Sequence, residues 1–169
     1  MRPIAPSLPG ADGTSTPRLV LRDGSVASVR PATPADIPAL RQFFRDLSSA
    51  SHYQRFMTAG DPPDAVIERL SSSADPSRSL TFVAERAALA PTPAGDHALR
   101  IIATASYIAI TADEAEVAFA VADDFQGRGL GTALLERLAV AAVSRGFRRF
   151  QATTLDDNTR MRELFRDSG

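Results

Sequence analysis

The sequence predicts an α/β domain built on a mixed, mostly antiparallel sheet that is flanked by helices. Two observations carry this prediction. Apolar and β-branched runs typical of strands are concentrated between residues 80 and 122, whereas helical spacing of apolar residues dominates on either side. Residues 114–155 read as strand, long helix and strand, and a crossover of this kind makes its two strands parallel.

Start and stop signals divide the rest of the chain. Thr33 followed by Pro34 is a typical helix start, Gly146 is a typical residue after a helix end, and Asn158 is a typical N-cap. The expected elements in chain order are a strand at 25–29, helices opening at Thr33 and Pro62, strands at 80–84, 100–110 and 114–122, a helix at 129–145, a strand at 150–155 and a final helix after Asn158.

The composition is that of an ordinary globular protein, with 44% hydrophobic and 23% charged residues in a chain of 169. Residues 1–17, rich in Pro, Gly, Ser and Thr, are expected to be a disordered arm before one domain over 18–169. The net charge of -1 gives no strong field, so we expect neither nucleic acid nor membrane as a partner. Without cysteine, a thiolate metal site and a cysteine nucleophile are excluded, and no metal is expected. With no secretion signal or membrane span, a cytoplasmic location is expected.

The decisive feature lies between the strand at 114–122 and the helix at 129–145. Gly127, Gly129 and Gly131 alternate where the strand leads into the helix, and residues without Cβ let a ligand approach the backbone closely. The first amides of a helix have no partner within it, and the helix dipole adds partial positive charge there. We therefore expect a phosphate-binding loop, to which Arg128 adds a cation and Thr132 a hydroxyl.

Three nucleotide-binding patterns can be compared with this loop. A P-loop requires Lys after the last glycine, where Thr132 stands. A dinucleotide fingerprint requires its third glycine one position later and an acidic residue about 20 residues further on. Neither pattern fits. Gln126-x-x-Gly129-x-Gly131 instead resembles the (Gln/Arg)-x-x-Gly-x-(Gly/Ala) signature of the GNAT acetyltransferases.

The resemblance covers roughly residues 25–169 and implies the GNAT fold, acetyl-CoA as acyl donor, and a loop that binds the CoA pyrophosphate. In this family the strand before the loop flanks the pantetheine arm through backbone groups, and an Asn placed like Asn158 hydrogen-bonds the same arm. The resemblance assigns cofactor binding to Phe119, Ala120, Val121, Gln126, Gly127, Arg128, Gly129, Leu130, Gly131, Thr132, Asn158 and Phe165.

Two features depart from the family. Many members place a Tyr in the last helix as a general acid, but Phe165 stands at that position and cannot donate a proton. The chain ends at Gly169, where members usually continue with two more strands, as expected for a shortened chain or for a piece of a longer, multidomain protein.

Two segments resemble one particular group within the GNAT family. The strand at 114–122 with its loop, and the segment from His52 to Phe56, are similar to the protein-lysine acetyltransferases of the Pat type. In bacteria these are often joined to a domain resembling an NDP-forming acyl-CoA synthetase, and they acetylate a lysine of acyl-CoA synthetases. This implies that the acceptor is a lysine of a protein such as an acyl-CoA synthetase.

Glu116 is the expected catalytic base. An amine must lose a proton before it attacks a thioester, and a nearby carboxylate can accept that proton. Strand alternation puts Glu114 and Glu116 on one face with Ala118 and Ala120, which leaves room for ligands. Glu116 also matches the catalytic Glu of Pat-type enzymes when counted back from the loop. Glu114 is the alternative base, and a solvated strand residue is the alternative interpretation of Glu116.

Three functions remain open on the sequence. The first is direct acetyl transfer to a protein lysine, which agrees with the absence of cysteine because no covalent enzyme intermediate is required. The second is acetylation of a small amine. The third is a CoA-binding regulatory module without catalysis, against which Glu116 on a face of small residues argues.

Overall fold

The computed structural model describes residues 17–58, 60–72, 75–87, 99–155 and 158–166. It contains one six-stranded sheet whose strands are ordered as they occur in the chain. The strands are β1 (Arg18–Val20), β2 (Val26–Pro31), β3 (Ser79–Ala87), β4 (Leu99–Ala109), β5 (Glu114–Val121) and β6 (Arg149–Gln151). Neighbouring strands are antiparallel from β1 to β5, and β5 and β6 are parallel, so the predicted mixed sheet is confirmed.

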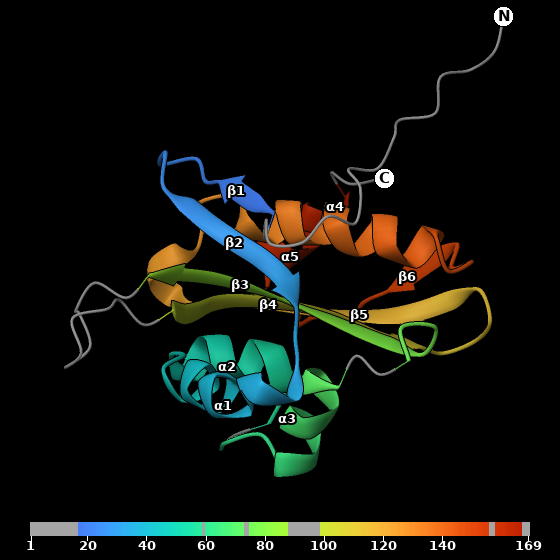
Figure 1. Ribbon diagram of the computed structural model, residues 1–169, viewed down its shortest axis with the longest axis horizontal. Helices are drawn as coiled ribbons and strands as arrows, with labels where there is room; N and C mark the ends of the chain where they lie inside the picture. The colour runs from blue at the N-terminus through green and yellow to red at the C-terminus, as the bar shows by residue number, and fades with distance from the viewer. Residues whose placement is uncertain (1–16, 59, 73–74, 88–98, 156–157, 167–169) are drawn as a thin grey trace, which may run out of the picture.

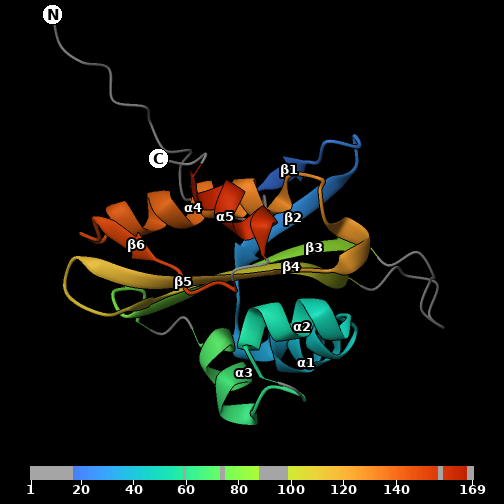
Figure 2. The ribbon, with the colours of Figure 1, turned by 180° about the vertical axis from the view of Figure 1, so that it is seen from behind.

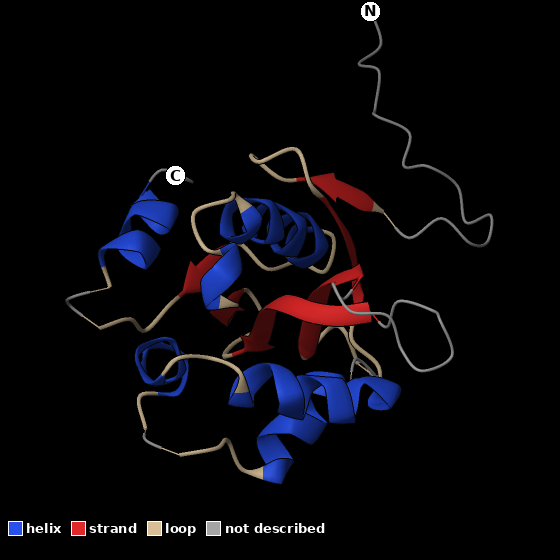
Figure 3. Ribbon diagram, turned by 90° about the vertical axis from the view of Figure 1, so that its left-hand side faces the viewer, coloured by secondary structure: helices blue, strands red, loops and turns tan. Residues whose placement is uncertain are grey.

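Helices cover both faces of this sheet. They are α1 (Ile37–Arg45), α2 (Ser49–Phe56), α3 (Asp64–Ser71), α4 (Leu130–Val143) and α5 (Thr159–Arg166), with short 3-10 turns η1 (Pro34–Asp36) and η2 (Asp123–Phe125). Figures 1 and 2 show α1, α2 and α3 on one face and α4 and α5 on the other, and the side view in Figure 3 shows the same layers. No helix among these residues is long and apolar enough to cross a membrane.

The crossover from β5 through α4 to β6 confirms the predicted strand–helix–strand unit. Leu130, Leu134 and Leu138 recur on one side of α4, and each is buried against the sheet. The N-terminus of α4 therefore lies at the carboxyl end of β5.

Two elements were not predicted, β1 and α2. α2 has only eight residues and is rich in serine, so its helix depends on contacts from elsewhere in the fold. Ser48 is its N-cap, with its hydroxyl accepting a hydrogen bond from the Ser51 amide at 3.2 Å. β1 is three residues long and pairs only with β2. The expected arm at 1–17 lies outside the described residues except for Pro17, and so does the loop expected at 88–96.

An ion cluster joins the first strands to the first helices. The Arg30 guanidinium on β2 donates two hydrogen bonds to Asp36, at 2.7 and 2.8 Å, and also bonds Glu85 on β3. Asp36 lies at the start of α1 and accepts a further bond from the Thr33 amide at 2.7 Å. The Arg30 hydrogen bond lowers the pKa of Asp36 to about 2. This cluster fixes the entry of α1 against the sheet.

We predict that Asp36→Asn lowers the free energy of unfolding by about 2 kcal/mol at neutral pH, since the Asp36 pKa falls from 3.8 to about 2 on folding. Because that pKa is depressed, its contribution is present above pH 4 and is lost as the pH falls toward 2. Urea unfolding of both proteins from pH 7 to pH 2 measures the difference.

The matched control is Asp64→Asn, which removes the exposed partner of Arg41. An exposed pair contributes about 0–1 kcal/mol, so this variant should differ little from wild type. A difference between Asp36→Asn and wild type that stays constant from pH 7 to pH 2 would contradict the role of the carboxylate.

Candidate active site

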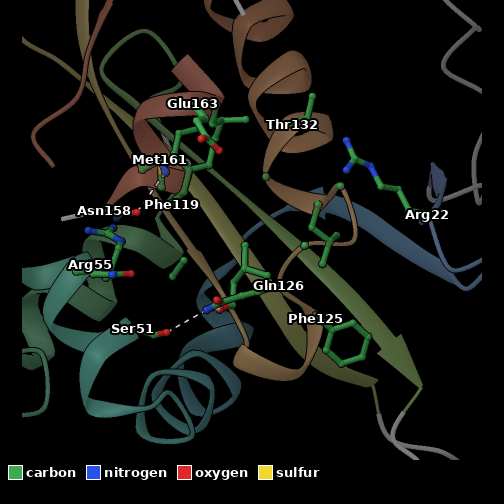
Figure 4. A pocket seen from close by; sticks show the side chains of 18 residues that line it. Arg22, Ser51, Arg55, Phe119, Phe125, Gln126, Thr132, Asn158, Met161 and Glu163 are labelled. Carbon is green, nitrogen blue, oxygen red and sulfur yellow. Dashed lines mark hydrogen bonds between the residues drawn. The ribbon is translucent and has the colours of Figure 1, made fainter. Parts of the chain in front are cut away.

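A cavity of about 440 Å³ lies where the end of β5 meets the first turn of α4 (Figure 4). Arg22 is at one end of the cavity in this view, and Arg55 and Asn158 are at the other. The predicted cofactor residues that line it are Phe119, Ala120, Val121, Gln126, Gly127, Gly129, Leu130, Gly131, Thr132 and Asn158.

The glycine loop has the backbone conformation of an anion site. Gly127 and Gly129 have φ angles of 76° and 89°, in the left-handed region that favours glycine. Gly129 is the N-cap of α4 and supplies no capping side chain, so the amides of residues 130–132 have no acceptor within the helix. With the helix dipole, these amides form a site suited to phosphate.

Arg22 lines the cavity beside this site, whereas the Arg128 side chain is held by other groups of the protein. Arg128 donates to the Asp23 carboxylate at 2.5 Å and to the Asp124 carbonyl at 2.6 Å, its guanidinium lies 4.9 Å from the Phe125 ring centroid, and it is absent from the cavity lining. Arg22, from the turn between β1 and β2, lines the cavity, and its amide donates to the Arg128 carbonyl at 3.0 Å. Direct contact between Arg128 and a phosphate therefore remains a prediction.

Gln126 connects the loop to α2. Its side-chain amide donates to the Ser51 hydroxyl at 3.0 Å and to the Val121 carbonyl at 3.2 Å. The Ser51 hydroxyl donates in turn to the Asp123 carboxylate at 2.6 Å, which also accepts bonds from Ser48. These bonds hold the pKa of Asp123 below its ordinary value, against the opposing effect of its burial. The network joins the start of α2 to the cavity wall.

The parallel pairing of β5 and β6 ends where the cavity begins. Three residue pairs are formed, the last between Glu116 and Gln151. The sequence prediction that this strand continues to Leu155 was wrong, because the chain leaves the sheet after Gln151. A second cavity of about 30 Å³ lies here, bordered by residues 117–119 of β5 and residues 152–154.

Asn158 and Phe119 border both cavities, and Phe165 borders the smaller one. Asn158 is buried and lines both, and its Oδ1 accepts the Met161 amide at 3.2 Å, which confirms the predicted helix cap. Phe165 lines the smaller cavity and packs edge-on against Phe119, with ring centroids 6.0 Å apart. Phe165 therefore borders the smaller cavity and not the larger one at the glycine loop.

Glu116 lies at the last pair before the strands separate. It is exposed, whereas Ala118 is half-buried and Ala120 is buried on the same face of β5. Glu116 lines neither cavity, but its charge acts on Arg55 of α2, so it faces the α2 side of the sheet. The core face predicted for this strand holds for Val117 and Phe119, which are buried, while Val121 is half-buried in the cavity wall.

Sequence reasoning missed several lining residues, because the elements that supply them were unpredicted or distant. Arg22 follows β1, and no local pattern marks it. Ser51, Gln54 and Arg55 come from α2. Phe125 follows a predicted strand, and the predicted final helix supplies the remaining three, Met161, Glu163 and Leu164. Of these lining residues, Gln54 and Arg55 belong to the segment from His52 to Phe56 that the sequence had singled out.

These residues fit a CoA thioester. The volume lies in the usual range of ligand sites, one end offers helix amides and Arg22 to phosphates, and the walls combine apolar side chains with the polar groups of Asn158 and Gln54. Residues 119–121 lead from the phosphate end toward the gap between β5 and β6.

We predict that Gly131→Val lowers the affinity for CoA at least tenfold, about 1.4 kcal/mol. Gly131 has an ordinary φ angle, and an added Cβ would meet only Leu164 at 3.5 Å, so the variant should fold. Its branched side chain would then intrude on the ligand space. Calorimetric titration with CoA measures the change, with Gly131→Ala as the smaller step. Unchanged affinity in folded Gly131→Val would contradict the loop assignment.

Comparisons with known proteins agree with this geometry. Residues 42–169 match the acetyltransferase (GNAT) family. Acetyltransferase Pat of Mycolicibacterium smegmatis is 34% identical over 146 residues, which are 85% of this chain and 41% of that protein. An acetyltransferase of Pseudomonas aeruginosa is 31% identical over 146 residues, 85% of this chain and 74% of that protein. The chain thus spans less than half of the first relative.

The crystal structure of the GNAT domain of PAT from S. lividans superimposes with a TM-score of 0.76 and is 36% identical, covering 90% of this chain and 86% of that one. The predicted fold and the resemblance to the GNAT acetyltransferases are therefore confirmed. Membership of an acetyltransferase family argues against the third hypothesis, a CoA-binding module without catalysis. The chain belongs to the GNAT acetyltransferase family and is an acetyl-CoA-dependent N-acetyltransferase.

Proposed function

We propose that this enzyme, in the cytoplasm, acetylates a lysine side chain of a protein, and that the protein is an acyl-CoA synthetase. The proposal is carried by the 36% identity to the GNAT domain of PAT, together with the Pat-like segments identified in the sequence. The exposure of Glu116 supports it. A lysine that projects from a protein surface can reach an exposed base without the whole acceptor entering a pocket.

The proposed chemistry is direct transfer. A lysine amine has an ordinary pKa of about 10.4 and is mostly protonated at neutral pH. Glu116, directly or through a water, takes the proton, and the amine then attacks the thioester. The acetyl donor would be held by the amides of residues 130–132 and Arg22 at its phosphates, and by Asn158 along its arm. The amide groups of β5 near Val121 would polarise the thioester carbonyl.

We predict that Glu116→Gln lowers turnover by about 10²-fold or more at neutral pH, because it removes the base and keeps the shape. Binding of acetyl-CoA should be nearly unchanged, since Glu116 lies outside both cavities. The loss should shrink as pH rises and free amine becomes abundant. Steady-state rates from pH 6.5 to pH 9.5 measure this, with Glu114→Gln in parallel. If only Glu114→Gln loses turnover, the base is Glu114.

We predict that a purified acyl-CoA synthetase is a better acceptor than any small amine. Remote contacts with a protein surface lower the transition-state energy, and free lysine lacks them. The measurement is the specificity constant for the synthetase beside those for polyamines, aminoglycosides and amino acids. All 19 basic residues of this chain are arginine, so a labelled lysine can only belong to the acceptor.

The control acceptor is the synthetase with its modified lysine replaced by arginine, which should take up no label. A small amine that exceeds the protein by tenfold or more would replace the proposed function with small-amine acetylation.

A further inference from the structure

Arg55 is a half-buried cation whose guanidinium has no charged partner in contact among the residues that the structure describes. It projects from α2 into the wall of both cavities, and its Nε is fully buried with no hydrogen-bond partner. No ion pair or hydrogen bond joins its side chain to any residue that the structure describes. Its one specific contact is with the ring of Phe56, whose centroid lies 4.9 Å from the guanidinium carbon.

An unpaired buried charge is unfavourable for folding, so arginines that serve only the fold are normally paired. Burial lowers the pKa of Arg55 to about 10, with Glu116 opposing that effect and Arg69 adding to it. Arg55 therefore still carries its charge at neutral pH. Its donors are available to an oxygen atom of a ligand in the cavity.

The position of Arg55 identifies which part of the ligand it would meet. Arg22 and the first turn of α4 occupy the opposite end of the cavity (Figure 4). With the phosphates of the donor there, its arm runs along β5 toward residues 117–119 and the gap between β5 and β6. The thioester then lies beside Arg55. The Thr154 hydroxyl, which also lines this gap, is buried without a partner as well.

We propose that Arg55 is a catalytic residue that donates a hydrogen bond to the thioester carbonyl oxygen and stabilises the negative charge that develops on it. This rests on the proposed acetyl transfer. As the amine nitrogen bonds to the carbonyl carbon, the carbonyl electron pair moves onto the oxygen that Arg55 holds. Glu116 has already taken the ammonium proton before the attack, so the nitrogen loses its second proton to solvent. The carbon–oxygen double bond then re-forms, and the carbon–sulfur bond breaks to release the CoA thiolate.

The same low polarity that makes the unpaired charge costly strengthens its effect on the oxyanion. Arg55 and Glu116 are close enough to influence each other electrostatically but form no ion pair. The cation is therefore not neutralised by the base, and the two groups can act on the oxygen and on the amine separately.

The test uses Arg55→Met, with Arg69→Met as matched control, since Arg69 is an exposed arginine outside both cavities. Arg55→Met should lower kcat by about 10²-fold while KM for acetyl-CoA changes less than about threefold. Arg55→Lys, which keeps a cation, should recover part of kcat. Arg69→Met should match wild type.

A second readout does not depend on turnover. Infrared spectra of bound acetyl-CoA, carbon-13 labelled at the carbonyl, should show a lowered carbonyl stretching frequency in wild type and Arg69→Met. Arg55→Met should return the band to its position in free acetyl-CoA. An unshifted band in wild type, or equal shifts in wild type and Arg55→Met, would overturn the proposal.

Two structural roles give different results. If Arg55 only supported the fold, Arg55→Met would lower the thermal midpoint, whereas loss of an unpaired buried charge should leave it unchanged or raise it. If Arg55 acted only through Glu116, Arg55→Met would shift the lower limb of the pH–rate profile and leave the carbonyl band in place. Either result contradicts the proposal.

The experiment also separates this inference from the proposed function. If wild-type enzyme shows the carbonyl shift but labels no protein lysine, the proposed lysine acceptor is contradicted and the proposed role of Arg55 is not. Active enzyme whose Arg55→Met variant keeps its rate and its carbonyl shift would remove the role of Arg55 alone.

Discussion

The site depends on the short pairing between the parallel strands β5 and β6, which stops after a few residues. β5 and β6 form three residue pairs and then separate, although both belong to a sheet that is otherwise continuous. Backbone groups beyond the last pair are available to a ligand, because strands that stay paired would satisfy one another. The separation also sets the order of the site along β5. Glu116 lies at the last pair, the small cavity follows at residues 117–119, and the large cavity continues to the glycine loop.

A second constraint holds α2 against the segment that follows β5 and leads into the glycine loop. The start of α2 is attached to the segment after β5 through Asp123, Ser48 and Ser51, and Gln126 adds a bond from the glycine loop to Ser51. Gln126 belongs to the motif that resembles the GNAT signature, and its side chain donates to the Ser51 hydroxyl and to the Val121 carbonyl. The first residue of the motif therefore shapes the loop and places α2, which carries Arg55. One glutamine thus links the phosphate end of the cavity to the acyl end.

The sequence predicted correctly the features that depend on residues close together in the chain. The crossover at 114–155, the glycine turn and the Asn158 cap were all predicted, because periodicity, glycine spacing and capping residues act over a few neighbours. It was insufficient where distant segments determine the structure. α2 is short and serine-rich, and its cap residue Ser48 bonds to Asp123, which is distant in sequence. The ion pair of Arg128 was not predicted for the same reason, since its partner Asp23 is far away in sequence.

The arginines of this chain differ in whether a carboxylate pairs with them, and this difference distinguishes a structural role from a chemical one. Arg30 is held by two buried carboxylates, and its charge fixes α1 to the sheet. Arg41, Arg45 and Arg100 form exposed pairs that contribute little to stability. Arg55 is half-buried with its Nε enclosed, and among the described residues no counter-charge contacts it. A fold selected only for stability would pair or replace it, as burying an unpaired charge is unfavourable. Its retention at the acyl end of the cavity is explained if the missing partner is the charge that forms during the reaction.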